Sequence, residues 1–302
     1  MGLRGVKIAQ ANDPGADNWY SLPMPKPDNV PTEGSVSAAV VLHHSDLDNL
    51  RATLTSVARA VDALGVSTPL YLIDQSRDPQ YGAAVRALVS DLNPVGLLRL
   101  DYIAREKNGG YGAGHNSVLD DSLGDIHFIL NPDVELPEEL LIRVRQTMAD
   151  HPDVVVLAPR GANSEGEEEY LAKRYPTCLV LLIRAFAPDW LQRRFEKQMN
   201  HYELRDLPSD GSLQDVPLLS GCCLAVRSDS FRAVRGFDEG FFLYFEDYDL
   251  CMRLRSEGRV VRDPGLQVIH HGGQAARKGW QHILWFARGG LRFFSLWGWR
   301  WV

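Results

Sequence analysis

The sequence predicts an α/β protein with a mostly parallel central sheet flanked by helices. Apolar runs typical of buried parallel strands recur at residues 36–42, 69–74 and 96–103. Helical patterns separate them, the first running to about Leu64 and the second from about Gln80 to Leu92. Strands that alternate with helices at this spacing predict βαβ units, which build a parallel sheet.

Composition narrows the class of protein. The chain has 302 residues and is 45% hydrophobic, enough for one large core or two modest ones. A net charge of −7 argues against a nucleic-acid partner. No apolar signal segment or membrane-spanning run is present, so we expect a cytoplasmic protein. Four cysteines without metal-ligand spacing predict buried free thiols: Cys178, Cys222, Cys223 and Cys251.

The chain divides into three predicted parts. Residues 1–34 are rich in Pro, Asp, Asn and Gly, which predicts an extended arm. Residues 35–272 carry the βα rhythm and form the predicted catalytic domain. Within it, residues 160–215 form an irregular helical insertion, which we expect on the side of a second substrate. Residues 273–302 form a predicted amphipathic helical tail.

A glycine-rich block at residues 108–116 has four glycines in nine residues and opens a helix predicted to continue to about Leu123. Glycine lets a backbone approach a ligand closely, and a helix N-terminus favours anions. The spacing matches neither the P-loop nor the dinucleotide-binding fingerprint, which argues against both classes. A purely structural turn is the alternative for this block.

An aromatic run from Gly240 leads into three acids, Glu246, Asp247 and Asp249, followed by a helical pattern. Acids at a helix start can cap free N–H groups, which is the alternative reading of each one alone. Like charges against an apolar wall raise the pKa of one carboxylate, which suits a general base. For the cluster as a whole we therefore favour a catalytic role.

A second acid lies upstream, at the end of a short apolar strand. Residues 126–134 end in an Asn-Pro-Asp turn that places Asp133 just beyond the strand's carboxyl end. Open α/β sheets bind their ligands at that edge. Asp133 is a hard oxygen ligand, suited to a divalent cation that also binds phosphate. Ordinary turn chemistry is the alternative.

Several blocks occur together in a set order along the chain. They are Leu-Ile-Asp74, the glycine-rich block, Asn-Pro-Asp133, Ser220-Gly-Cys-Cys-Leu, Gly236-Phe-Asp-Glu, Phe245-Glu-Asp-Tyr-Asp-Leu-Cys and Val268-Ile-His-His. This set resembles the inverting family 2 glycosyltransferases of the GT-A fold, especially the bacterial rhamnosyltransferase-like branch. The resemblance implies the GT-A nucleotide-sugar-binding fold.

The resemblance also implies roles for residues. Asp247 stands where the family carries its catalytic base, and Asp74 would read the nucleotide base. Asp133 and His270 would hold Mg²⁺ or Mn²⁺, and Asn131 replaces the first acid of the Asp-x-Asp metal motif. The expected donor-binding residues are His43, Asp74, Asn108, Gly110, Gly112, Asn116, Asn131 and Asp133. The expected acceptor-binding residues are Gly221, Glu246 and Asp247.

The implied function is the transfer of a sugar from a nucleotide-activated donor to an acceptor. We expect L-rhamnose from dTDP-rhamnose, passed to a saccharide or lipid-linked saccharide in cell-surface polysaccharide synthesis. UDP-galactofuranose or another UDP-hexose is an alternative donor. A sugar nucleotidyltransferase is another alternative, although it would carry a Gly-rich basic signature where this chain has His43-His-Ser-Asp46. A non-catalytic module on the same fold is the third.

The tail has an unusual composition. No acid follows Asp263, whereas five tryptophans and five basic residues do. One helical face is predicted to carry Trp280, Leu284, Ala287, Leu291 and Phe294, with Arg288 and Arg292 on another. Such a helix either packs on the domain or contacts an anionic bilayer. We expect peripheral contact with the cytoplasmic face of the inner membrane.

Overall fold

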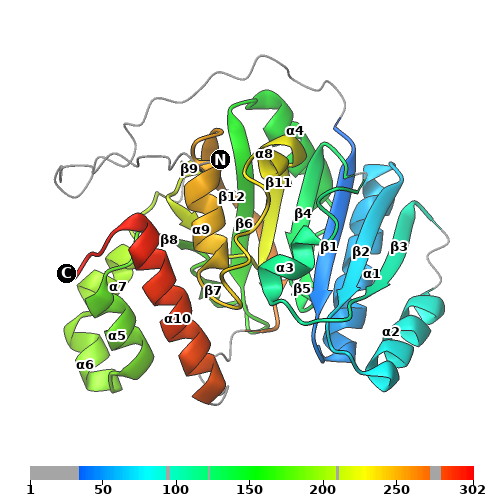
Figure 1. The fold of residues 1–302 in the computed structure, drawn as a ribbon. Coiled ribbons are helices and arrows are strands. Elements are labelled where there is room, and N and C mark those ends of the chain that lie inside the picture. The colour runs from blue at the N-terminus through cyan, green and yellow to red at the C-terminus, as the bar shows by residue number, and fades with distance from the viewer. Residues whose placement is uncertain (1–33, 93–95, 122, 209–210, 273–279) are drawn as a thin grey trace, which may run out of the picture.

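The computed structural model describes residues 34–92, 96–121, 123–208, 211–272 and 280–302, and it confirms the α/β architecture (Figure 1). The central sheet has the order β3-β2-β1-β4-β11-β6-β12-β5. Strands β3, β2, β1, β4, β6 and β12 share one direction, while β11 and the short β5 run against their neighbours. The predicted arm at residues 1–34 lies outside the described residues except for Gly34.

The first half of the chain follows the predicted βα rhythm. Its elements are β1 (Val36–Leu42), α1 (Leu47–Leu64), β2 (Thr68–Asp74), α2 (Pro79–Leu92), β3 (Leu98–Ala104), α3 (Tyr111–Asn116) and β4 (Ile126–Leu130). Asp46 caps α1, as its Oδ1 accepts hydrogen bonds from two backbone N–H groups of the first turn. Along β1, Ala38 and Val40 enter one core cluster and Ala39 and Val41 another, so both faces of the strand are covered.

The second half is less regular. It contains β5 (Val134–Glu135), α4 (Leu140–Asp150), β6 (Val154–Ala162), β7 (Glu168–Glu169), β8 (Ala172–Lys173), α5 (Cys178–Phe186), α6 (Asp189–Arg194), α7 (Glu196–Tyr202), β9 (Gln214–Asp215), β10 (Leu218–Leu219), β11 (Cys223–Arg227), α8 (Ser228–Ala233), α9 (Glu246–Leu254), β12 (Arg259–His270) and α10 (Trp280–Trp297).

Three elements differ from those that the sequence pattern predicts. The apolar run at 216–226 predicts one strand, but a turn at residues 220–222 divides it into β10 and β11. The runs at 259–262 and 267–271 predict two short strands, but they form one strand, β12, with a register shift between Asp263 and Gln267. The helix expected to reach Leu123 ends at Asn116, where the backbone changes to i→i−3 hydrogen bonds such as that from the Leu119 N–H to the Asn116 carbonyl. The Asn116 side chain bonds the backbone of Phe237.

The insertion and the tail share a hydrophobic core of their own. This third cluster joins Tyr175 and Tyr202 of the insertion to Phe245 beside α9 and to Phe293 and Phe294 of α10. Figure 1 shows α5, α6, α7 and α10 together at one end of the sheet, away from α1 and α2. The tail is therefore packed on the domain, directly behind the acidic stretch.

The predicted apolar face of the tail is mostly exposed. Of the five residues expected to line it, Phe294 is buried, but Trp280, Leu284 and Leu291 are 69%, 49% and 58% exposed. The helix approaches the domain through Gly289 and Gly290, where an added Cβ at Gly289 would lie 2.6 Å from the Tyr244 carbonyl oxygen. Two residues without side chains allow this close approach of the backbones.

All four cysteines are free and buried, as predicted. Among the described helices, none is both long and apolar enough to cross a membrane.

Candidate active site

A strained turn orients the acidic stretch at the start of α9. Tyr244 and Phe245, the two residues before α9, have φ angles of 71° and 68°. Bulky residues rarely adopt this left-handed conformation, which costs of order 1–3 kcal/mol each and persists where surrounding packing enforces it. Here Phe245 is buried against Phe286 and Phe293 of α10. The turn places Glu246 and Asp247 in the first turn of α9.

Backbone N–H groups hold the carboxylate of Asp247. Its Oδ2 accepts from the N–H of Gly221 at 2.9 Å, and its Oδ1 accepts from the N–H of Tyr248 at 2.8 Å. Burial raises the pKa of Asp247 to about 6, and these hydrogen bonds oppose the rise. The carboxylate is therefore fixed in position, and its pKa lies close to the range that suits a general base.

The neighbouring Glu246 is 5% exposed, and its Oε2 has no hydrogen-bond partner among the described residues. Burial, reinforced by the Asp247 charge, raises the pKa of Glu246 to about 8. A buried polar atom without a partner is costly in a folded protein. The protonated carboxyl of Glu246 can donate a hydrogen bond to a ligand beside Asp247.

The turn between β10 and β11 connects the two acidic sites. Gly221 donates to Asp247, and the next residue, Cys222, accepts from the backbone N–H of Asn131 at 2.9 Å. The Tyr111 hydroxyl donates to the Gly221 carbonyl at 2.7 Å. Burial and several nearby negative charges, including Glu246, Asp247 and Asp133, raise the pKa of this phenol. The acids at 133 and 247 therefore flank one turn, although 114 positions separate them in sequence.

The glycine-rich block is fixed against the acidic stretch. Gly110 has a φ of 92°, and a Cβ there would collide with the carbonyl oxygen of Phe242. That same carbonyl accepts from the N–H of Tyr111 at 3.0 Å. Gln75 holds the block from the other side, donating to the Gly110 carbonyl at 2.9 Å and accepting from the Gly109 N–H at 3.0 Å. Glycine at 110 is thus a requirement of close backbone approach.

Asp133 and His270 lie together at the sheet edge, as expected of them. Asp133 Oδ1 is 3.4 Å from His270 Nε2 and is buried without a hydrogen-bond partner among the described residues. His270 Nδ1 is 2.7 Å from Glu169 Oε2. Burial would lower the pKa of His270, but Asp133 and Glu169 outweigh it and raise that pKa to about 9.

These residues fit part of a cation site. Within the described residues, no group of three or more His, Cys, Asp or Glu side chains is arranged to hold a metal. The unpartnered oxygen of Asp133, the nearby imidazole and the Asn131 amide, whose Nδ2 is 3.5 Å from His270 Nε2, leave room for ligands from elsewhere. Mg²⁺ and Mn²⁺ sites of this kind take further oxygens from phosphate and water.

The expected donor side is formed by the ends of parallel strands. His43, exposed, follows β1, and Asp74 ends β2. Asp74 is 4% exposed and accepts from the Tyr102 hydroxyl at 2.6 Å and the Ser76 N–H at 2.8 Å. This carboxylate is already engaged, and its role in reading a nucleotide base stays a prediction.

The remaining donor-side residues have structural partners. Asn108 accepts from the Gly110 N–H at 2.9 Å. Gly112 faces Phe237, where an added Cβ would lie 2.6 Å from that residue's Cβ. Asn116 donates to the Phe237 carbonyl and accepts from its N–H. These contacts shape the loop, and direct donor contact by the three residues stays a prediction.

Sequence reasoning missed three supporting residues. Gln75 directly follows Asp74, so its place after a strand end was a usable signal. Tyr111 lies inside the glycine-rich block, but its bond to Gly221 joins segments 110 positions apart. Glu169 belongs to an acidic loop with no pattern that distinguishes it from its neighbours, and only the pairing of β7 with β6 brings it to His270.

Comparison with known proteins decides the family. A family model described as glycosyl transferase family 2 matches residues 37–234, more than half of the chain. The chain belongs to glycosyl transferase family 2. The match covers β1, β4 and the glycine-rich block and ends before α9 and β12. The acids of α9 and His270 therefore lie outside the matched region, and their roles stay predictions.

This family 2 chain is similar to curated rhamnosyltransferases. It is 29% identical over 177 residues to the N-acetylglucosaminyl-diphospho-decaprenol L-rhamnosyltransferase of Mycobacterium tuberculosis, covering 54% of this chain and 56% of that protein. It is 27% identical over 188 residues to rhamnosyltransferase WbbL of Escherichia coli (strain K12), covering 57% and 64%. The similarity therefore spans between half and two thirds of these relatives' length.

Solved structures confirm the GT-A fold. The crystal structure of GalNAc-T7 with UDP, GalNAc and Mn²⁺ superposes with a TM-score of 0.62 at 13% identity, covering 88% of this chain and 48% of that one. The mannosyltransferase PcManGT of Pyrobaculum calidifontis, in complex with GDP-Man and Mn²⁺, gives a TM-score of 0.56 at 14% identity, covering 91% and 69%. At these identities the likeness concerns the fold alone.

The raised pKa of Glu246 predicts a pH-dependent stability. Between its ordinary value of 4.5 and about 8, the folded chain keeps a proton that the unfolded chain has released. The free energy of unfolding therefore falls as pH rises through this window. Glu246→Gln should reduce the difference in unfolding free energy between pH 5 and pH 8 by about 1 kcal/mol or more. Urea titrations at both pH values measure it.

The matched control for this variant is Glu138→Gln, at an exposed position, which should leave the pH dependence unchanged. Equal pH dependence of the wild type and the Glu246 variant would show that this carboxyl is not protonated in the folded chain.

Proposed function

We propose that this chain catalyses inverting transfer of a sugar from a nucleotide-activated donor to an acceptor hydroxyl. The observation that carries the proposal is the pair of acidic sites around the 220–222 turn. On one side, Asp247 is half-buried and held by two N–H groups. On the other, Asp133 presents an unpartnered oxygen beside His270. We therefore propose that Asp247 accepts a proton and that Asp133 binds a cation that also binds phosphate.

Inversion needs a base on the acceptor side of the sugar. As the acceptor oxygen attacks the anomeric carbon, Asp247 takes the proton from that hydroxyl. The two hydrogen bonds that fix Asp247 keep its carboxylate in one orientation, which favours a productive alignment. Glu246, protonated beside it, can bind an acceptor oxygen. Gly221, with no side chain, lets the acceptor approach Asp247.

The leaving group is a nucleoside diphosphate, which gains negative charge as it departs. A divalent cation bound there would neutralise that charge. Asp133 would hold the cation, and His270 would join it as a ligand on losing its ring proton, while Asn131 lies beside them in place of an acid. One carboxylate fewer than in an Asp-x-Asp site predicts weak binding of the cation in the absence of donor. Glu169 orients His270 through its Nδ1.

The proposed donor is dTDP-rhamnose, and the proposed acceptor is a saccharide or a lipid-linked saccharide. The support is the similarity to two curated rhamnosyltransferases, one of which acts, by its name, on a sugar linked to diphospho-decaprenol. UDP-galactofuranose or another UDP-hexose is the alternative donor. Transfer assays with each of these nucleotide sugars discriminate between them.

Asp247→Asn should lower the rate of transfer by about 10²–10⁴-fold, because the amide cannot take the acceptor's proton. Donor affinity, measured by calorimetry, should change less than about threefold, since the amide oxygen can still accept one backbone hydrogen bond. Asp229→Asn is the control, as that acid also lies in the first turn of a helix but is fully exposed. Wild-type turnover by the Asp247 variant would remove this residue from the mechanism.

Removal of divalent cations should stop transfer, and Mg²⁺ or Mn²⁺ should restore it. Asp133→Asn should weaken donor binding in the presence of cation by about tenfold or more, because the amide carries no charge. In EDTA, the variant and the wild type should bind donor equally. Undiminished transfer in excess EDTA would show that the site works without a cation.

We also propose that the end of the molecule formed by α5, α6, α10 and the residues after α10 contacts an anionic membrane. Apart from Ile269, the exposed large apolar residues of the described part of the chain lie there, among them Leu182, Trp190, Trp280, Leu291, Trp299 and Trp301. Clustered exposed apolar surface marks an interaction site. Tryptophan with nearby arginine suits a bilayer interface, where each basic residue contributes about 1 kcal/mol.

Trp280→Glu should reduce sedimentation with anionic liposomes at low salt by about half or more, because it places a charge at an exposed apolar position. Gln281→Glu adds the same charge at an exposed polar neighbour and should have a smaller effect. Point variants test this contact better than a truncation would, since α10 supports Phe245 beside the acidic stretch. Failure of the wild-type chain to sediment with anionic liposomes would refute the membrane contact.

A further inference from the structure

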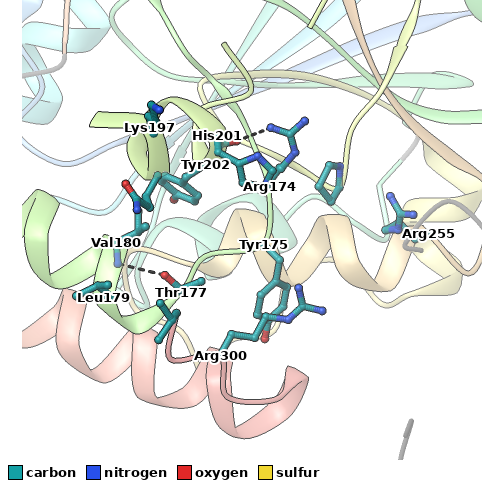
Figure 2. A pocket seen from close by; sticks show the side chains of 13 residues that line it. Arg174, Tyr175, Thr177, Leu179, Val180, Lys197, His201, Tyr202, Arg255 and Arg300 are labelled. Atoms are coloured by element: carbon teal, nitrogen blue, oxygen red, sulfur yellow. Dashed lines mark hydrogen bonds between the residues drawn. The ribbon is translucent and has the colours of Figure 1, made fainter. Parts of the chain in front are cut away.

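A cavity of about 360 Å³ lies between the insertion and the residues that follow α10. Residues of segments 174–180 and 197–202 form two of its walls, and Pro217, Arg255, Arg300 and Val302 complete it. Figure 2 shows Arg174, Arg255 and Arg300 arranged around the side of Tyr175, with Lys197 and Tyr202 from α7 nearby. The volume is within the range of small-molecule sites.

The lining is strongly basic, although the whole chain carries a net charge of −7. Four cationic side chains come from four separate segments: Arg174, Lys197, Arg255 and Arg300. None of the thirteen described residues that line the cavity is Asp or Glu. An anion that enters the cavity would therefore meet cationic side chains from several parts of the chain.

Arg174 and Lys197 differ in how they are held. The Arg174 guanidinium binds the carboxylate of Asp206 through two hydrogen bonds of 2.7 and 2.9 Å, which fixes its position. Lys197 is exposed and has no ion-pair partner among the described residues. Its flexible ammonium is therefore available to a phosphate that enters the cavity.

The other part of the lining is apolar. Leu179, Val180 and Pro217 join the rings of Tyr175 and Tyr202. Val180 and Tyr202 are 5% exposed and belong to the third hydrophobic cluster, so this wall is a rigid part of the core. A site with cationic groups beside an apolar wall suits an amphiphilic anion better than inorganic phosphate.

The apolar wall is connected to the proposed base. The hydroxyl of Tyr202 is 2.9 Å from the hydroxyl of Tyr248, and the N–H of Tyr248 donates to Asp247 Oδ1 at 2.8 Å. Two hydrogen-bonded contacts therefore lead from the cavity to the carboxylate that we propose takes the acceptor's proton. The cavity therefore adjoins the segment that holds Asp247.

We propose that this cavity binds the phosphate-bearing, apolar part of the acceptor, a lipid-linked diphosphate. Lys197, Arg255 and Arg300 meet the diphosphate, and Leu179, Val180 and Pro217 contact the first part of the lipid chain. The exposed apolar surface around Trp190 and Trp301 borders the same end of the molecule, where the rest of the chain enters a bilayer. This inference rests on the proposed function, because it places the acceptor's sugar toward Asp247.

Calorimetry with farnesyl diphosphate, a short prenyl diphosphate, tests the cavity on the full chain without catalysis. We expect it to bind at least tenfold more tightly than either inorganic diphosphate or farnesol. Inorganic diphosphate lacks the apolar chain, and farnesol lacks the charged groups. Equal affinity for inorganic diphosphate would reduce the site to a simple anion site and overturn the proposal. No binding of farnesyl diphosphate would overturn it too.

Substitutions in the cavity lining test where the ligand binds. Lys197→Glu should weaken farnesyl diphosphate binding about tenfold or more, because it reverses a charge in the lining. Arg193→Glu makes the same change at an exposed position of α6 outside the lining and should alter affinity less than threefold. Leu179→Trp, which narrows the cavity, should weaken the prenyl diphosphate more than inorganic diphosphate. Unchanged thermal melting of each variant shows that it folds, and equal effects of Lys197→Glu and Arg193→Glu would overturn the assignment.

Competition separates this inference from the proposed function. A nucleoside diphosphate with Mn²⁺ should not displace farnesyl diphosphate, because we place the donor at Asp133. Displacement would put the prenyl diphosphate in the donor site and overturn the cavity assignment, while leaving the glycosyltransferase proposal intact. Binding of farnesyl diphosphate that depends on Lys197, in a chain that binds no nucleotide sugar, would instead refute the proposed function alone.

Discussion

The carboxylate of Asp247 depends on two backbone N–H groups and on the left-handed turn that precedes it. Tyr244 and Phe245 adopt a conformation that costs of order 1–3 kcal/mol each, and isolated chain would not hold it. Packing of Phe245 against α10 supplies the compensation, as Gly289 brings that helix onto the Tyr244 carbonyl. The position of Asp247, the proposed base, is thus fixed by packing against the C-terminal helix.

The same packing gives the tail a structural role, in addition to the membrane contact that we propose for it. Trp297 donates to Asp249 at 2.9 Å, and Asp249 also accepts from Arg253. The third acid of the stretch therefore anchors α10 to α9, whereas Glu246 and Asp247 face the site. One face of α10 supports the acidic stretch while the opposite face stays exposed. The surface that we propose for membrane contact is therefore built on the helix that positions the proposed base.

The insertion links that surface to the chemistry. Its helices share a core with α10, and Tyr202 reaches Tyr248 next to the base. A basic, partly apolar cavity lies where insertion and tail meet. One fold serves many functions, and the function of a given chain resides in the sites that are built on the fold. The insertion and tail are the parts of this chain that would select an acceptor.

Sequence by itself determined the sheet and the short-range parts of the site. Apolar runs and strand ends located β1, β2 and β4 and the acids Asp74 and Asp133, because the patterns that predict buried strands and turns involve residues close together in the sequence. It also singled out Asp247, whose aromatic and acidic neighbours are adjacent in the chain. Tertiary structure alone decided which face of α10 is buried, since two glycines permit an approach that a hydrophobic pattern does not reveal. It also decided the partners Tyr111 and Glu169, because hydrogen bonds between segments about 100 residues apart depend on how strands pair and leave no periodic signal.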